Sequence, residues 1–276
     1  MNPYYEEKDI LLYYGDCLEI MPTLADKSID MILCDLPYGT TACKWDTIIP
    51  FEPLWAQYKR LIKDNGAIVL TASQPFTSAL VMSNPGWFKY EWIWDKTVGA
   101  NIMQAKYQPM KIHENIVVFC KGKINYHPIK TLKDVKNVRP IMKSGFSNTY
   151  NTVVKNDKCD YINKFPESII RESSRNGECN PLKRLHPTQK PVALFEYLIR
   201  TYTNEGDTVL DNCAGSGTTG VACKNLKRKA ILIEKEEKYC EIIVDRIKRP
   251  GEKIMVKKEV RREQKNLTFG FRKEKI

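Results

Sequence analysis

A carboxylate, a proline and an aromatic ring stand close together in Asp35-Leu36-Pro37-Tyr38, directly after the apolar run 29–34. The apolar run predicts a buried strand, and Asp35 at its end would project from the sheet edge where open α/β folds bind ligands. Leu36 precedes a proline and is therefore biased towards an extended conformation, which aims its carbonyl outward. With the ring of Tyr38, the turn offers two acceptors and a stacking surface, a receptor for a planar amine.

A glycine-rich loop is the second group of residues with chemical potential. Gly215, Gly217 and Gly220 form the pattern G-x-G-x-x-G between a predicted strand and a predicted helix. Glycines there allow a tight turn and let backbone N–H groups approach a ligand at the helix N-terminus. The pattern alone is equally typical of a simple tight turn.

Two carboxylates flank this loop and narrow the choice of ligand. Glu234 ends the next predicted strand, 23 residues after Asp211, where a carboxylate accepts both hydroxyls of a ribose. NAD is the usual ligand of such a loop, but its loop opens the first βαβ unit, whereas this one lies late in the chain. Asp211 would repel a pyrophosphate and attract an ammonium group. We therefore favour S-adenosylmethionine, which carries an ammonium group and a ribose.

Short β-branched runs alternate with amphipathic stretches, a pattern that predicts a parallel sheet covered on both faces. Strands are expected at 9–14, 28–34, 66–71, 88–96, 114–122, 206–211 and 229–234, and helices within 15–26, 51–65, 74–84, 191–203, 217–228 and 236–249. The polar segment 123–185 follows neither period and is typical of an inserted lobe. The predicted fold class is a doubly wound, mostly parallel α/β domain, residues 1–122 and 186–249, that carries this insert.

Composition sets further bounds on function. The chain has 276 residues, is 42% hydrophobic and contains no apolar run of membrane-spanning length. Its N-terminus is acidic and has no apolar stretch typical of a secretion signal, so a cytoplasmic location without membrane contact is expected. The nine cysteines include no CxxC pair and no Cys/His cluster with zinc spacing, so we expect reduced thiols and no metal site.

The positive charge is concentrated at the C-terminus. The net charge is +11, and residues 246–276 hold twelve Lys or Arg against four Glu. Such a run is usually a solvated tail. Nucleic acid is the sharper alternative, because Lys and Arg release the counterions condensed on phosphates. The tail 250–276 is therefore treated as a separate basic segment.

The turn at 35–38 resembles the D-P-P-Y motif of the amino DNA methyltransferases, which methylate N6 of adenine or N4 of cytosine with S-adenosylmethionine. The motif order is similar as well: this turn, a variable lobe, the sequence HPTQKP at 186–191, and then the glycine loop. That order is the circularly permuted arrangement of the beta class, and the resemblance covers residues 9 to about 248. It departs at Leu36, where the family usually has proline; since the family uses the backbone carbonyl there, activity is expected to survive.

The resemblance implies a mechanism that the turn itself supports. Asp35 and the Leu36 carbonyl would hydrogen-bond the exocyclic amine of the target base and favour tetrahedral geometry at its nitrogen. The methyl group then transfers directly, so positioning and electrostatics supply most of the rate. The base must first be flipped out of the duplex, with Tyr38 as its stacking floor.

The resemblance also implies which residues bind the cofactor. Asp16 would contact its adenine ring and Lys190 its methionine carboxylate, while Thr188 also fits a helix cap ahead of Pro191 at a first helical position. The residues assigned to cofactor binding are Asp16, Cys17, Thr188, Gln189, Lys190, Asp211, Cys213, Gly215, Gly217, Thr218 and Glu234.

Two segments are assigned to DNA. The loop 40–46 would close over the flipped base, although its Trp45 equally fits a core aromatic. The segment 123–185 occupies the family's target-recognition position, and its Lys, Arg, Asn and Tyr residues suit phosphate and base-edge contacts. Double-stranded DNA is thus the expected partner, while a homodimer and a cognate restriction enzyme are left open by the resemblance.

Other functions fit the sequence less well than methylation at N6 of adenine. Cytosine C5 methylation is set aside, because the thiolate nucleophile of that family follows a proline and none of these cysteines does. N4-cytosine methylation uses the same fold but more often has serine at the position of Asp35, so N6 of adenine is favoured. An NAD-dependent dehydrogenase and a non-catalytic DNA-binding protein remain as alternatives from other classes.

Overall fold

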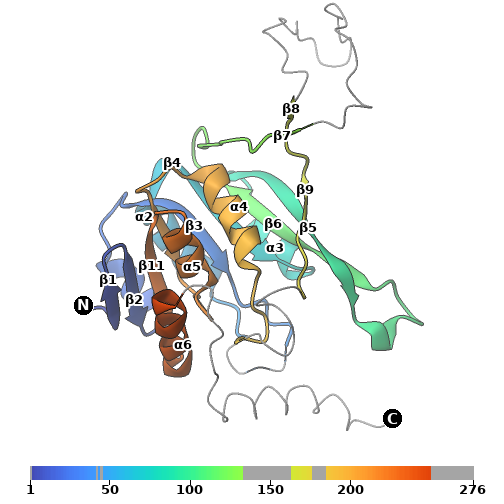
Figure 1. The fold of residues 1–276 in the computed structure, drawn as a ribbon, viewed down its shortest axis with the longest axis horizontal. Helices are drawn as coiled ribbons and strands as arrows, with labels where there is room; N and C mark the ends of the chain where they lie inside the picture. The colour runs from blue at the N-terminus through green and yellow to red at the C-terminus, as the bar shows by residue number, and fades with distance from the viewer. Residues whose placement is uncertain (1, 42, 44–45, 133–162, 176–184, 250–276) are drawn as a thin grey trace, which may run out of the picture.

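The computed structural model describes residues 2–41, 43, 46–132, 163–175 and 185–249. In this part of the chain, nine strands form one sheet with the order β1-β2-β11-β10-β3-β4-β6-β5-β9 (Figure 1). Two short strands pair separately as β7 and β8. The strands are β1 Tyr5–Glu7, β2 Ile10–Tyr14, β3 Ile29–Asp35, β4 Ile62–Ala72, β5 Phe88–Ala100, β6 Lys111–Phe119, β7 Thr131–Leu132, β8 Asn163–Lys164, β9 Ile169–Arg171, β10 Thr208–Asp211 and β11 Lys229–Glu234.

The centre of the sheet is parallel. Strands β2, β11, β10, β3 and β4 pair in parallel, whereas β1 and β6 run antiparallel to their neighbours. Antiparallel pairing continues from β6 to β5, and β9 is parallel to β5. The predicted doubly wound, mostly parallel α/β fold is therefore confirmed.

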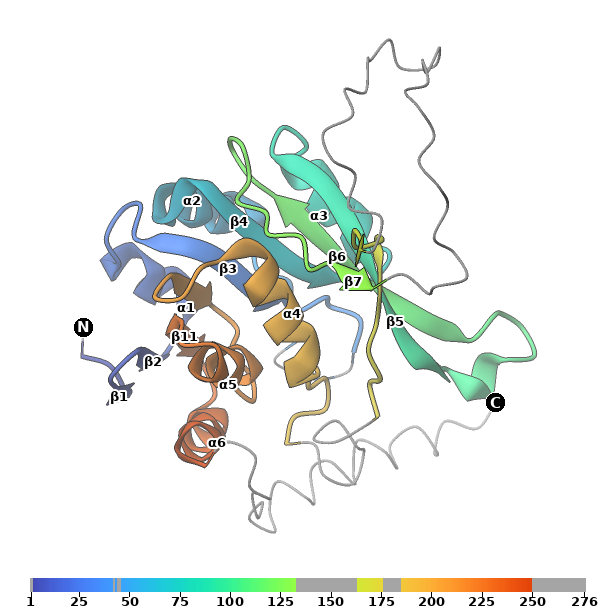
Figure 2. The same ribbon diagram turned by 45° about the horizontal axis from the view of Figure 1, so that its top comes forward.

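Helices cover both faces of the sheet. The main helices are α1 Cys17–Ile20, α2 Phe51–Leu61, α3 Phe76–Ser83, α4 Val192–Tyr202, α5 Thr218–Asn225 and α6 Glu237–Lys248. Helices α4, α5 and α6 pack on one face and α1, α2 and α3 on the other (Figures 1 and 2). Short 3₁₀ turns, Met21–Thr23 and Ile102–Gln104, follow α1 and β5.

Strand β3 shows why the sequence forms a buried layer. Met31 and Leu33 pack with α4 and α5, while Ile32 and Cys34 point to the face that α1 and α2 cover. All four side chains are fully buried. A continuous apolar run is typical of such a two-sided strand, and each large aliphatic side chain buried there contributes roughly 1.5–3 kcal/mol.

The order of the strands brings distant parts of the chain together. Strand β10 lies between β11 and β3, and Val209 is in register with Met31. Because these strands are parallel, their carboxyl ends meet at one edge. Asp35, Asp211 and Glu234 are the last residues of β3, β10 and β11. The two sequence motifs therefore share one edge of the sheet.

The structure extends some predicted elements. Strand β5 is four residues longer than expected, and β6 begins and ends three residues earlier than expected. The two strands form a hairpin that projects beyond the helices, with Ala100 opposite Lys111 (Figure 1). Strand β9 lies within the segment predicted as an inserted lobe and joins the main sheet. Most of that segment, residues 133–162 and 176–184, and the basic tail 250–276 lie outside the described residues. No helix in the described part of the chain is long and apolar enough to cross a membrane.

Candidate active site

The carboxylate of Asp35 is the centre of a hydrogen-bond cluster at the carboxyl edge of β3. Its neighbour on β4 is Thr71, which is in register with it. The hydroxyls of Thr71 and Tyr38 donate to Oδ1 of Asp35, the latter at 2.8 Å. The ring of Tyr38 stacks on Phe76 at 5.3 Å between centroids. The turn thus holds a carboxylate and an aromatic ring in fixed positions.

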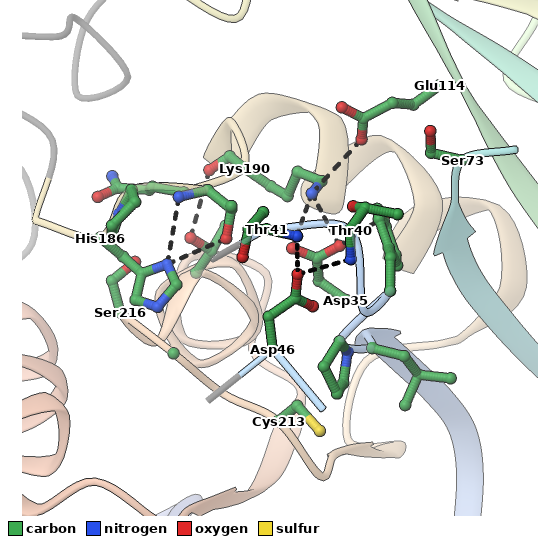
Figure 3. Close-up of a pocket in the computed structure, with 18 of the residues that line it drawn as sticks. Asp35, Thr40, Thr41, Asp46, Ser73, Glu114, His186, Lys190, Cys213 and Ser216 are labelled. Carbon is green, nitrogen blue, oxygen red and sulfur yellow. Dashed lines mark hydrogen bonds and ion pairs between the residues drawn. The ribbon is translucent and has the colours of Figure 1, made fainter. Parts of the chain in front are cut away.

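Lys190 reaches the same carboxylate from the loop before α4. Its ammonium nitrogen lies 2.7 Å from both Oδ1 and Oδ2 of Asp35 and 5.7 Å from the ring centre of Tyr38 (Figure 3). The Lys190 side chain is 7% exposed. Burial alone would lower the pKa of Lys190, but Asp35 and Glu114 raise it above its ordinary value, so the ammonium stays charged.

Glu114 of β6 links Lys190 to a second lysine. Its Oε2 lies 3.4 Å from the Lys190 nitrogen, and its Oε1 lies 3.1 Å from the nitrogen of Lys96 on β5. Burial tends to raise the pKa of Glu114, but the two lysines outweigh it and the pKa is lowered. The carboxylate is therefore ionised, and charges of alternating sign run from Asp35 to Lys96.

Asp46 fixes the start of the loop that follows the turn. Its carboxylate accepts backbone N–H bonds from Gly39 at 2.9 Å, Thr40 at 2.9 Å and Thr41 at 2.6 Å (Figure 3). Burial raises the pKa of Asp46, but these bonds and the Thr41 side chain outweigh it and lower the pKa. Trp45, predicted to close over the base or to enter the core, lies outside the described residues.

The glycine loop places two buried carboxylates beside its backbone. Glu234 accepts the N–H of Gly215 at 2.7 Å and of Glu236 at 2.9 Å. Burial is the main cause that raises the pKa of Glu234 to about 7, against these two bonds. Burial likewise raises the pKa of Asp211 to about 6, although the Thr219 hydroxyl and a backbone N–H donate to it. Both carboxyl groups therefore titrate near neutral pH.

A single cavity of about 830 Å³ brings these groups together. Of the residues predicted from the sequence, it is lined by Asp16, Cys17, Asp35, Leu36, Pro37, Tyr38, Thr188, Gln189, Lys190, Asp211, Cys213, Gly215, Thr218 and Glu234. Gly217 does not line the cavity. Its φ is +78°, and a Cβ there would lie 2.9 Å from Cγ1 of Ile243 on α6, so Gly217 serves the turn and the helix packing.

The segment 186–191 differs in detail from the expected helix entry. Helix α4 begins at Val192 after Pro191, and no side chain caps it. Instead, both the backbone N–H and the hydroxyl of Thr188 are hydrogen-bonded to Nδ1 of His186, at 3.3 Å and 3.1 Å respectively. The cap interpretation of Thr188 is therefore wrong, because the chain turns locally on His186 before the helix starts.

Several residues around Asp35 were not predicted from the sequence. Thr71 is the last residue of the predicted strand 66–71, so its position at the same carboxyl edge of the sheet could have been predicted. Glu114 and Lys96 belong to antiparallel strands whose pairing no local pattern specifies. Lys111, whose ammonium donates to the hydroxyl of Ser73, also lines the cavity. In the described part of the chain, no group of three His, Cys, Asp or Glu is arranged to hold a metal ion.

Sequence similarity to known proteins gives independent evidence about the family of this chain. The family model described as DNA methylase, of the N6/N4 type, matches residues 29–245. The Type II methyltransferase M.HpaI of Haemophilus parainfluenzae is 30% identical over 252 residues, which cover 87% of this chain and 74% of that protein. The Type II methyltransferase M2.LlaDCHI of Lactococcus lactis subsp. cremoris is 26% identical, with 89% and 92% covered.

Solved structures give the same picture of the fold. The M1.HpyAVI–SAM complex is 27% identical, with a TM-score of 0.57 over 86% of this chain and 99% of that one. The PvuII DNA methyltransferase, which is cytosine-N4-specific, reaches a TM-score of 0.63 over 98% and 96% of the two chains. At 16% identity, that second likeness shows the fold alone.

Proposed function

Because the chain belongs to the N6/N4 DNA methylase family, we propose that it methylates N6 of adenine at a specific site in double-stranded DNA. The sequence-based prediction of an amino DNA methyltransferase of the S-adenosylmethionine-dependent kind is confirmed. Adenine as the target is supported by the carboxylate of Asp35, since serine is more common at this position in the N4-cytosine enzymes that the motif resembles.

One observation carries the assignment of the reacting end of the cavity. Asp35 lies at the carboxyl edge of the sheet, oriented by two hydroxyls and next to the ring of Tyr38. A carboxylate held in this way is preorganised to accept an N–H bond from an exocyclic amine, which requires no reorganisation at the moment of reaction. The Leu36 carbonyl is the proposed second acceptor, and Tyr38 the surface on which the flipped base stacks.

The part of the cavity beside the glycine loop fits the cofactor. Glu234 and Asp211 supply acceptors for ribose hydroxyls and an ammonium group, and the loop backbone approaches closely at Gly215. When bound, S-adenosylmethionine supplies the electrophilic methyl group. The protein's part is to hold the amine in line with it, and such positioning accounts for much of the rate in a direct transfer.

The segment predicted to recognise DNA borders this cavity where it is described. Ser174 and Arg175, which follow β9, line it, and the N–H of Ser174 donates to the carbonyl of Lys96 at 3.3 Å. This placement supports 123–185 as the target-recognition region. A homodimer and a cognate restriction enzyme stay predictions from the resemblance, although the curated relatives are Type II methyltransferases.

The test is to incubate the protein with labelled S-adenosylmethionine and unmethylated DNA of mixed sequence, then digest the DNA and identify the labelled nucleoside. We expect N6-methyladenine. Label in N4-methylcytosine would keep the fold and the amine chemistry but overturn the assignment of the base. Absence of label in DNA, with the cofactor bound, would overturn the proposed function.

A further inference from the structure

We propose that Glu114 is a positioning residue: it takes over Lys190 when the amine of the target base takes the place of Lys190 on Asp35. The proposal rests on the proposed role of Asp35, but not on whether the base is adenine or cytosine, because both present an exocyclic amine. It is based on a row of alternating charges. Figure 3 shows Asp35, Lys190 and Glu114 of this row, and Lys96 continues it beyond Glu114.

The ammonium of Lys190 has the contacts expected of the substrate amine. It donates to both oxygens of Asp35 at 2.7 Å and lies 5.7 Å from the ring centre of Tyr38. A flipped base that stacked on this ring and bonded to this carboxylate would bring its own N–H donors to the same place. The lysine and the base therefore compete for one position.

Counting acceptors shows how little of the carboxylate Lys190 leaves for an amine. A carboxylate has about four lone-pair sites. In this structure Oδ1 accepts from Tyr38, Thr71 and Lys190, and Oδ2 accepts from Lys190. Oδ1 therefore accepts three donors at its two lone pairs, whereas Oδ2 has one lone pair left. An amine bonded to Oδ2 would lie beside the ammonium that bonds the same atom at 2.7 Å, and an amine reaches both oxygens only if Lys190 leaves.

Releasing Lys190 requires another counter-ion. Its side chain is 7% exposed, and a buried ammonium without a partner is strongly unfavourable. Glu114 is already at 3.4 Å, and its own side chain is 16% exposed. Lys96, which is 11% exposed, holds Glu114 from the other side at 3.1 Å. A small movement of the ammonium from Asp35 to Glu114 keeps the ammonium paired, while Asp35 accepts an N–H of the amine in its place.

The test measures single-turnover methylation at saturating DNA and cofactor. In Glu114→Gln, Lys190 keeps Asp35 as its only carboxylate partner in this cluster, so fewer complexes have the amine on Asp35. We expect the rate to fall about tenfold or more, while the dissociation constants for DNA and S-adenosylmethionine change less than about threefold. Glu91→Gln, an exposed glutamate on the adjacent strand β5, is the matched control and should keep the normal rate.

A double-mutant cycle separates this role from a purely structural one. If Glu114 acts through Lys190, adding Glu114→Gln to Lys190→Met should change the rate of that single variant less than about twofold. The proposal would be overturned if the rate reductions of the two single variants multiplied in the double variant. A normal rate in Glu114→Gln would overturn it as well. If Glu114→Gln does not fold, Glu114→Asp tests the same point: it keeps the charge but draws it away from Lys190, so we expect a smaller fall in the rate that likewise disappears in the Lys190→Met background.

Two parallel measurements distinguish this proposal from the proposed function. Wild-type protein that methylates no DNA would contradict the proposed function itself. If Asp35→Ala methylates DNA as fast as the wild-type protein, the role of Asp35 is contradicted. The exchange of Lys190 for the target amine depends on that role. If the wild-type protein methylates DNA and Asp35→Ala does not, independent effects of Glu114→Gln and Lys190→Met contradict only the role of Glu114.

Discussion

The hydroxyl of Tyr58 donates a 2.6 Å hydrogen bond to the side-chain oxygen of Asn212, and both side chains are buried. Tyr58 lies on α2, which follows the turn at Asp35, whereas Asn212 directly follows Asp211 in the glycine loop. The bond therefore joins the part of the chain that carries the proposed reacting carboxylate to the part that carries the proposed cofactor loop.

Replacing Tyr58 by phenylalanine should loosen this connection. The change leaves the buried oxygen of Asn212 without its donor, which costs about 1–3 kcal/mol of the free energy of unfolding. Urea denaturation would measure the loss, and calorimetric titration should show weaker binding of S-adenosylmethionine because the loop is less fixed. Tyr14→Phe, at an exposed tyrosine, is the control; equal stability of the two variants would contradict the prediction.

Asp35→Ala should abolish methyl transfer and leave the fold and most cofactor binding intact. The variant removes the acceptor for the target amine, while Lys190 keeps Glu114 as a counter-ion. Transfer of label to DNA and titration with S-adenosylmethionine measure the two effects. Asp9→Ala, at a half-buried aspartate next to β2, should behave as wild type. Near-normal turnover in Asp35→Ala would disprove the assignment.

Cofactor affinity should rise with pH through the titration of Glu234. Its pKa is about 7 without ligand, and ribose hydroxyls bind best to the ionised form. Between pH 6 and 8 the ionised fraction rises about tenfold, so the dissociation constant for S-adenosylmethionine should fall by up to about tenfold. Calorimetric titration across this range would measure it. In Glu234→Gln most of this dependence should be lost; an unchanged pH profile would exclude Glu234 as its cause.

The same group has the opposite effect on the stability of the free protein. Folding raises the pKa of Glu234 from 4.5 to about 7, because burial disfavours its charged form. The unfolded chain thus binds fewer protons in this window, and the contribution to stability declines as pH rises from about 4.5 to about 7. Bound cofactor should reduce this decline.

The sequence predicts the carboxylates at the ends of the parallel strands better than the charged residues on the antiparallel strands. The turn at Asp35 and the glycine loop are local patterns, and the parallel strands before them fix where their carboxylates emerge. Lys190 was expected at the cofactor but lies on Asp35, because its partner is decided by charges that are far away in the sequence. The positions of Glu114 and Lys96 depend on the antiparallel pairing of β5 with β6. No local sequence motif predicts the register of that pairing.

Gly217 offers a test of what the glycine pattern does in this chain. Gly217→Ala introduces a residue at φ +78° and a Cβ 2.9 Å from Ile243, so we expect a loss of roughly 2–4 kcal/mol of stability. Gly206→Ala shares the positive φ but has open space around it and should cost about 1 kcal/mol. Gly86→Ala has neither feature and should be neutral. Thermal unfolding of the three variants would measure this order, and equal losses at Gly217 and Gly206 would remove the packing argument.

The basic tail 250–276 lies outside the described residues, but its sequence makes a definite prediction. It carries nine Lys or Arg against four Glu, and such charges bind DNA by releasing counterions from phosphates. Deleting the tail should weaken DNA binding mainly at low salt and reduce the slope of log affinity against log salt concentration, since screening removes its contribution at high salt. A tail of the same composition in scrambled order should restore the slope, because the effect depends on charge rather than on residue order. A slope unchanged by the deletion would mean that the tail is a solvated extension without a role in DNA binding.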